Sequence, residues 1–142
     1  MTKVKIIERD LGWRAIRKRL SGGGAGVEVG IFDPEQASKA VFNEYGTSDI
    51  PERSFLRATF DAQRPAMVRQ LAKGASQVME GKATLEQVLD GVGADLVEDI
   101  KRTIANMSSP PNAPGTINQK GANDPLVDTG AMMAAVEHKV DP

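Results

Sequence analysis

Residues 84–104 read TLEQVLDGVGADLVEDIKRTI and form the most regular pattern in the chain. Most intervals between the apolar residues are three or four positions, which places these residues on one face of an α-helix. They are Leu85, Val88, Leu89, Val92, Leu96, Ile100 and Ile104. Thr84 and Gln87 fit a capping box at the start of this helix. Gly91 and Gly93 each cost it about 1 kcal/mol relative to alanine, so either the helix bends there or another segment packs closely.

A second helical pattern precedes this one and spans residues 55–80. Phe55, Leu56 and Phe60 begin it, and we expect Phe55 and Leu56 to anchor it in the core. Pro65 lacks an N–H and clashes with the preceding turn, so the pattern predicts an interruption there, with Arg64 as a new cap. The predicted apolar face after the interruption comprises Val68, Leu71, Ala75, Val78 and Met79.

Further toward the N-terminus, residues 27–32 alternate between apolar and other side chains, which predicts a strand. Asp33-Pro34 ends it, and residues 35–45 then read as a helix that ends at Gly46. Its expected inward side chains are Ala37, Ala40, Val41 and Tyr45. Residues 47–53 form a loop that contains Pro51, whose ring fixes an extended entry to the next helix.

Before this strand, the glycine-rich run of residues 21–26 reads as a turn. It follows a predicted helix from Asp10 to Leu20, in which Trp13, Ile16 and Leu20 share helical spacing. Residues 3–8 predict a short strand with Val4 and Ile6 on one face. Met1 to Glu8 contains no apolar run, so a secretory signal is not expected.

The C-terminal part contains the stretch with least periodicity. Residues 106–125 are rich in proline, glycine and asparagine. Long structureless loops are uncommon in compact domains, so this one is either a surface loop or a loop ordered by contact with a neighbouring subunit. Residues 129–130 read as a turn, and residues 133–140 as a strand that pairs with residues 27–32. We therefore expect one α+β domain over residues 1–142, with a small, mainly antiparallel sheet packed against several helices.

Composition excludes several kinds of chemistry. The 142 residues contain no cysteine and one histidine, His138, which rules out disulfides and thiolate catalysis and argues against zinc. Asp95, Glu98 and Asp99 read as a solvated acidic face rather than a magnesium site, because no phosphate cradle accompanies them. No catalytic, cofactor-binding or metal-binding residue is predicted, and no stretch is apolar enough to span a membrane. We do not expect an enzyme.

Charge is unevenly distributed although the net charge is −1. Residues 1–20 carry seven basic and two acidic side chains, a balance of +5, and residues 80–100 carry six acidic and one basic, a balance of −5. Three interpretations are open: solvated helix faces, complementary contacts between subunits, or a basic helix that faces DNA. Arg53 and Arg57 are spaced to clamp carboxylates of a neighbouring subunit. The candidate interface residues are Arg14, Arg17, Lys18, Arg53, Arg57, Asp95, Glu98 and Asp99.

Three segments together carry a resemblance. They are Val29-Gly30-Ile31 followed by Asn43-Glu44-Tyr45-Gly46-Thr47, then Ile50-Pro51-Glu52-Arg53-Ser54-Phe55-Leu56-Arg57, and Pro125-Leu126-Val127-Asp128-Thr129-Gly130. Their order and spacing resemble the small neck or tail-completion proteins of long-tailed bacteriophages, over about residues 25–140. The residues that match the motifs are Asn43, Glu44, Tyr45, Gly46, Ile50, Pro51, Arg53, Phe55, Leu56, Leu126, Asp128, Thr129 and Gly130. One departure is Ala131-Met132-Met133, where many relatives have Gln-Leu-Arg.

The resemblance implies a structural virion protein that is assembled in the host cytoplasm. It would form a ring in the neck, with a hexamer expected first and a dodecamer second. The ring would contact the head-closure proteins and the tail terminator or tail tube, and DNA would pass through its lumen without specific binding. Two alternatives remain: a tail terminator that caps the tube, and a DNA-binding module that uses Arg14, Arg17, Lys18 and Arg19.

Overall fold

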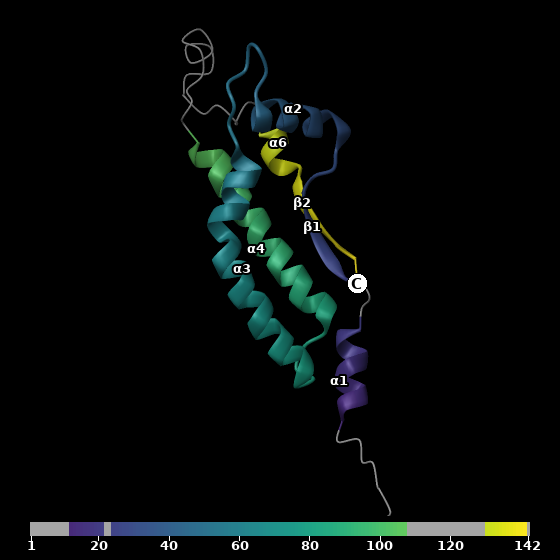
Figure 1. The fold of residues 1–142 in the computed structure, drawn as a ribbon. Coiled ribbons are helices and arrows are strands. Elements are labelled where there is room, and N and C mark those ends of the chain that lie inside the picture. Colours follow the sequence, from purple (N-terminus) through teal and green to yellow (C-terminus); the bar gives the residue numbers. More distant parts are fainter. Residues whose placement is uncertain (1–11, 22–23, 108–129, 142) are drawn as a thin grey trace, which may run out of the picture.

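The computed structural model describes residues 12–21, 24–107 and 130–141. These residues form five helices and two strands (Figure 1). The elements are α1 (Trp13–Leu20), β1 (Gly26–Ile31), α2 (Pro34–Tyr45), α3 (Phe55–Met79), α4 (Leu85–Asn106), α6 (Ala131–Ala134) and β2 (Val136–Asp141). The predicted α+β class is confirmed. The predicted strand at 3–8, nearly all of the 106–125 loop, and the motif residues Leu126, Asp128 and Thr129 lie outside the described residues.

Helix α4 lies at the centre of the fold, between α3 and the two-stranded sheet (Figure 1). The predicted capping box is present: the Gln87 backbone N–H donates to Thr84 Oγ1 over 3.1 Å, and the Thr84 N–H donates to Gln87 Oε1 over 3.0 Å. The predicted periodicity is also confirmed, because its residues from Leu89 onward are buried. The buried apolar side chains of α4 are Leu89, Val92, Leu96, Val97, Ile100 and Ile104.

Close packing explains one of the two glycines in α4. A Cβ atom on Gly93 would lie 2.5 Å from His138 Cδ2 and 2.8 Å from Val27 Cγ2, so the sheet approaches the helix closely there. A Cβ on Gly91 would meet only Gln70 Nε2, at 3.8 Å. Gly74 of α3 has the same role on the other side of α4, because a Cβ there would collide with Val88.

The sheet joins distant parts of the sequence. Strands β1 and β2 are antiparallel, with Val27 opposite Val140, Val29 opposite His138 and Ile31 opposite Val136. This confirms the predicted pairing. The predicted start of the last strand at Met133 was wrong, because residues 131–134 form α6 and β2 begins at Val136. Gly130, with φ at +79°, turns the chain into that helix, and alanine and methionine favour helical conformation.

Helix α3 runs continuously through Pro65, so the predicted interruption and the new cap at Arg64 were wrong. Proline removes one N–H, and the carbonyl that loses its partner belongs to Asp61. Asp61 and Pro65 both lie on the exposed side of α3, where water can hydrate that carbonyl. The long packing of α3 against α4 therefore maintains the helix across the proline.

Several predicted inward side chains are exposed instead. Val78 is fully buried, but Val68 is 60% exposed and Tyr45 is 63% exposed. The other apolar side chains predicted on a helix face or inward, yet found exposed, are Trp13, Val41, Leu71 and Met79. On α3, Leu71 lies on the same helical stripe as the buried Val78, but the elements of the described fold cover only part of the length of that stripe. In the described part of the chain, no helix combines the length and apolar composition that a membrane span requires.

Candidate functional site

The best-defined polar arrangement joins the end of α2 to the start of α3. Glu44, in the last turn of α2, is only 3% exposed. Its Oε2 accepts a hydrogen bond from the Leu56 backbone N–H over 2.9 Å, and its Oε1 accepts one from the Arg57 N–H over 3.0 Å. These N–H groups belong to the first turn of α3 and have no partner within the helix. Glu44 therefore caps α3 from a different helix.

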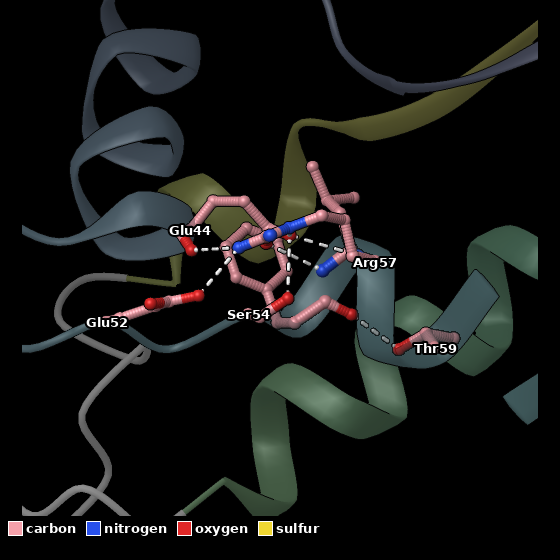
Figure 2. Close-up of polar contacts among 7 residues, drawn as sticks. Glu44, Glu52, Ser54, Arg57 and Thr59 are labelled. Atoms are coloured by element: carbon pink, nitrogen blue, oxygen red, sulfur yellow. Dashed lines mark hydrogen bonds and ion pairs between the residues drawn. The ribbon is translucent and has the colours of Figure 1, made fainter. Parts of the chain in front are cut away.

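The Ser54 hydroxyl completes this cap. Ser54 occupies the N-cap position of α3, but its side chain makes no capping bond to the helix. Instead, Ser54 Oγ donates to Glu44 Oε1 over 3.0 Å (Figure 2). Burial alone would raise the pKa of the Glu44 carboxyl, but hydrogen bonds from the backbones of Arg57 and Leu56 and from the side chains of Arg57 and Ser54 hold it below its ordinary value of 4.5. Glu44 is therefore an ionised structural group.

Arg57 clamps the same junction from the solvent side. Its Nε donates to Glu44 Oε1 over 2.9 Å, and its Nη2 donates to the Glu44 carbonyl over 2.9 Å and to Glu52 Oε1 over 2.8 Å (Figure 2). Its guanidinium also lies 4.6 Å from the centroid of the Tyr45 ring. The side-chain hydrogen bond to Glu44 raises the pKa of Arg57. The carboxylates that Arg57 binds thus belong to its own chain.

Arg53 is directed into the same junction. Its side chain is 5% exposed, and burial lowers the pKa of its guanidinium. The Arg53 N–H donates to the Asn43 carbonyl over 2.6 Å, and Arg53 Nη1 donates to Asn43 Oδ1 over 3.4 Å. Arg53 precedes α3 rather than lying on it, so the two arginines are not one helical turn apart. Both arginines therefore bind groups of their own chain, and their contact with a neighbouring subunit stays a prediction.

Gly46 allows the chain to return from α2 toward α3. Its φ is +73°, and a Cβ there would lie 2.9 Å from the Glu52 backbone nitrogen. In the turn that follows, the Thr47 N–H donates to the Ile50 carbonyl over 2.7 Å, and Thr47 Oγ1 accepts from the Ile50 N–H over 3.0 Å. Phe55, fully buried, then anchors α3 as expected. The central motif residues therefore build one junction between α2 and α3.

The other predicted charged interface residues lie on two separate helices, α1 and α4. Arg14, Arg17 and Lys18 are exposed on α1. On α4, Asp95 Oδ2 accepts from Gln70 Nε2 over 2.8 Å, and Asp99 Oδ1 pairs with Arg102 over 2.7 Å. Among the described residues, no three histidine, aspartate or glutamate side chains gather closely enough to hold a metal ion.

His138 is partly buried on the inner face of the sheet, and its Nε2 lies 2.7 Å from Asp90 Oδ1 on α4. The contact connects β2 to α4, directly beside the close approach at Gly93. Neither a nucleophile nor a second base accompanies the pair in these contacts.

Two groups of exposed apolar side chains remain, which we call the α2 surface and the α3 groove. The α2 surface consists of Val41, Phe42 and Tyr45, which are 52%, 50% and 63% exposed. The α3 groove is almost wholly apolar and lies between β1 and α3. Its lining residues are Val27, Val29, Phe60, Arg64, Met67, Val68, Leu71, Val92 and Leu96. Exposed apolar side chains that gather in one place are typical of protein or membrane interaction sites and of ligand-binding grooves.

The sequence did not identify these surfaces. A signal was available in α3, where Phe60, Leu71 and Val78 lie on one helical stripe and Val68 lies beside it. This stripe is fully buried at Val78 but exposed at Phe60 and Leu71, so the described residues cover only part of it. Comparisons with protein-family models, curated proteins and solved structures found no match to this chain.

Proposed function

We propose that this protein is a structural subunit of the neck of a long-tailed bacteriophage. It forms a ring that joins the head-closure proteins to the tail and lets DNA pass. The phage assignment rests on the three sequence motifs. The structure adds one observation that favours an assembly protein: large apolar side chains are exposed on both α2 and α3.

A ring needs two different surfaces on each subunit, because each copy meets the next head to tail. The α2 surface and the α3 groove are on different elements and therefore offer two such surfaces. The exposed cations of α1 and the acidic residues of α4 can add complementary charge to such a contact. A hexamer is the first expectation and a dodecamer the second.

Deletion of the gene from the phage distinguishes the neck role from the related role of a tail terminator. Loss of a neck subunit leaves tails of normal length that do not join heads stably. Loss of a terminator gives tubes of abnormal length. Electron microscopy of the particles shows both the tail length and the attachment of heads. Neck particles that lack the protein would refute the proposal.

A DNA-binding role for the basic residues of α1 is the competing assignment from a different class. It predicts an affinity for duplex DNA that falls steeply as salt concentration rises. Fluorescence anisotropy with labelled DNA at low salt measures it. Absence of binding dismisses the DNA-binding role, and tight binding with a steep salt dependence would favour it over the neck role.

A further inference from the structure

One edge of strand β1 is open. Among the described residues the sheet has two strands, and β1 pairs only with β2. The edge of β1 that faces away from β2 therefore has no strand partner in this part of the chain. Such an edge presents backbone N–H and C=O groups that can pair with a further strand.

The α3 groove lies beside this open edge. Val27 and Val29 of β1 form one wall, Phe60, Val68 and Leu71 of α3 form the other, and α4 contributes Val92 and Leu96. Residues of β2 do not line it. Because side chains alternate along a strand, a strand added beside β1 would direct every second side chain into the groove. The groove therefore suits a short segment whose alternate residues are apolar.

Residues 3–8, which lie outside the described residues, have this pattern. The segment reads KVKIIE, and Val4 and Ile6 fall on one side of a strand with Lys3 and Lys5 on the other. On the outer face of the sheet, Glu28 is exposed and stands opposite Lys139 of β2. A strand on the free side of β1 would bring Lys3 or Lys5 beside Glu28, and opposite charges on neighbouring strands are favourable.

The start of α1 favours a neighbouring copy as the source of this segment. Helix α1 leads from Gly12 toward β1, and its Trp13 end points away from the sheet (Figure 1). Because α1 has eight residues, its Trp13 end lies about 12 Å from its other end, which leads to β1. To reach the groove of its own chain, the segment before Gly12 would have to turn back along α1, so a neighbouring copy is the occupant tested first.

We propose that residues 3–8 of one copy add a third strand to the β1 edge of a neighbouring copy, with Val4 and Ile6 in the α3 groove. This inference rests on the self-assembly proposed above and names one of its contacts. The exchanged strand would close the sheet edge and cover the exposed side chains of Phe60, Val68 and Leu71.

Cysteine crosslinking tests the contact directly, because the chain contains no cysteine of its own. Ile6→Cys is made in one preparation and Val68→Cys in another that also carries a size tag. Val68 is 60% exposed, so its replacement leaves the core intact. The two preparations are mixed and treated with a bis-maleimide, and the mixed pair is recognised by its size on a denaturing gel.

Two matched controls test the specificity of the crosslink. In the first control, Lys5→Cys, on the opposite side of the predicted strand, replaces Ile6→Cys. In the second control, Phe42→Cys, on the α2 surface, replaces Val68→Cys. We expect the Ile6–Val68 pair to exceed either control at least severalfold. Leu71→Cys provides a second position in the groove if the Val68 variant does not fold.

Light scattering of the untreated mixture separates the two proposals. An oligomer that yields no excess of the mixed pair at either groove position overturns the strand exchange and leaves the ring standing. A monomer without the mixed pair overturns the strand exchange in the isolated protein. The ring is overturned only if the protein also stays monomeric when mixed with the adjacent head-closure and tail-terminator proteins. The double variant Ile6→Cys/Val68→Cys tests the remaining arrangement: a crosslink within one chain, with no mixed pair, would show that the groove is filled by its own chain.

Discussion

Glu44 shows how one residue can fix the position of two helices relative to each other. Its buried carboxylate accepts the first free N–H groups of α3, the Ser54 hydroxyl and the Arg57 guanidinium. A helix N-terminus carries a partial positive charge, so an anion at this place is favourable. The consequence is that α2 and the start of α3 form one unit in which the intervening loop has little freedom.

Replacement of Glu44 should therefore be costly. Glu44→Gln keeps the size of the side chain but removes the charge and places an amide donor against N–H donors. We expect the free energy of unfolding to fall by roughly 2–3 kcal/mol, measured by urea denaturation. Glu52→Gln is the matched control, because Glu52 binds the same arginine from a largely exposed position and should cost less than about 1 kcal/mol. Equal losses in the two variants would contradict the capping role.

The stabilising effect of Glu44 should also depend on pH. The pKa of Glu44 is lowered in the folded protein, so folding favours the ionised form. Its contribution is then fully present above the ordinary pKa of 4.5 and disappears as the pH falls through the lowered folded value. We expect the difference in unfolding free energy between the native protein and Glu44→Gln to shrink in acid. A difference that stays constant from pH 7 to about pH 2 would contradict this.

At this scale the sequence predicted the importance of the motif residues but not their roles. Arg53 and Arg57 have the spacing of one helical turn, which favoured a clamp on another subunit. The helix begins only at Phe55, and both side chains meet groups of their own chain. Where the helix begins decides which groups the two arginines can reach. The partner of Arg57, Glu44, comes from a different helix, and residue spacing alone does not reveal this.

The two glycines of α4 show how one element is shaped by its neighbours. Both lie in a helix whose periodicity was predicted from the sequence, but only Gly93 lies beneath the sheet. Its lack of a Cβ permits the close approach of His138 and Val27. The sequence left open whether the glycines marked a bend or a contact, because the partner strands lie 45 or more residues away on either side in the sequence.

Alanine substitutions should separate the two positions. Gly93→Ala forces Val27 and His138 away from α4, and we expect a loss of roughly 1–3 kcal/mol in unfolding free energy. Gly91→Ala meets no close atom and should raise the stability by up to about 1 kcal/mol through helix propensity. Thermal or urea denaturation of both variants checks this. A loss at Gly91 as large as that at Gly93 would indicate that the glycines serve backbone flexibility instead.

For helix α3, the existence of the helix was predicted better than which of its side chains are buried. Its apolar residues were recognised, but Val68 and Leu71 were expected in the core and are exposed. Hydrophobic spacing identifies an apolar stripe but not how much of its length is covered: Val78 is buried, whereas Leu71 on the same stripe is exposed. The extent of burial depends on the elements that pack there, which local spacing does not reveal.

At the scale of the whole molecule, the exposed apolar side chains should serve assembly more than folding. Phe42 on the α2 surface is 50% exposed, so Phe42→Asp should change the unfolding free energy by less than about 1 kcal/mol. The same change places a charge in the proposed subunit contact and should reduce the particle mass measured by light scattering. Ser38→Asp, also exposed on α2, is the control. An unchanged particle mass in Phe42→Asp would exclude this surface from the interface.

The α+β class and the pairing of β1 with β2 followed from the sequence, because alternation and helical periodicity are local patterns. The proposed function depends on surfaces between copies and on partner proteins, which a single chain does not display. The sequence showed the separation of basic residues at 1–20 from acidic residues at 80–100 despite the net charge of −1, but not where the helices that carry them lie in the fold. The neck assignment therefore remains a proposal that measurements on assemblies must test.

The most direct test is the mass of the purified protein in solution, alone and mixed with the adjacent head-closure and tail-terminator proteins. Light scattering coupled to size exclusion gives this mass. We predict either a ring near six times the 15.2 kDa chain mass, or a discrete complex that forms only with those partners. A particle of 15.2 kDa that stays monomeric alone and in both mixtures would contradict the proposed neck role.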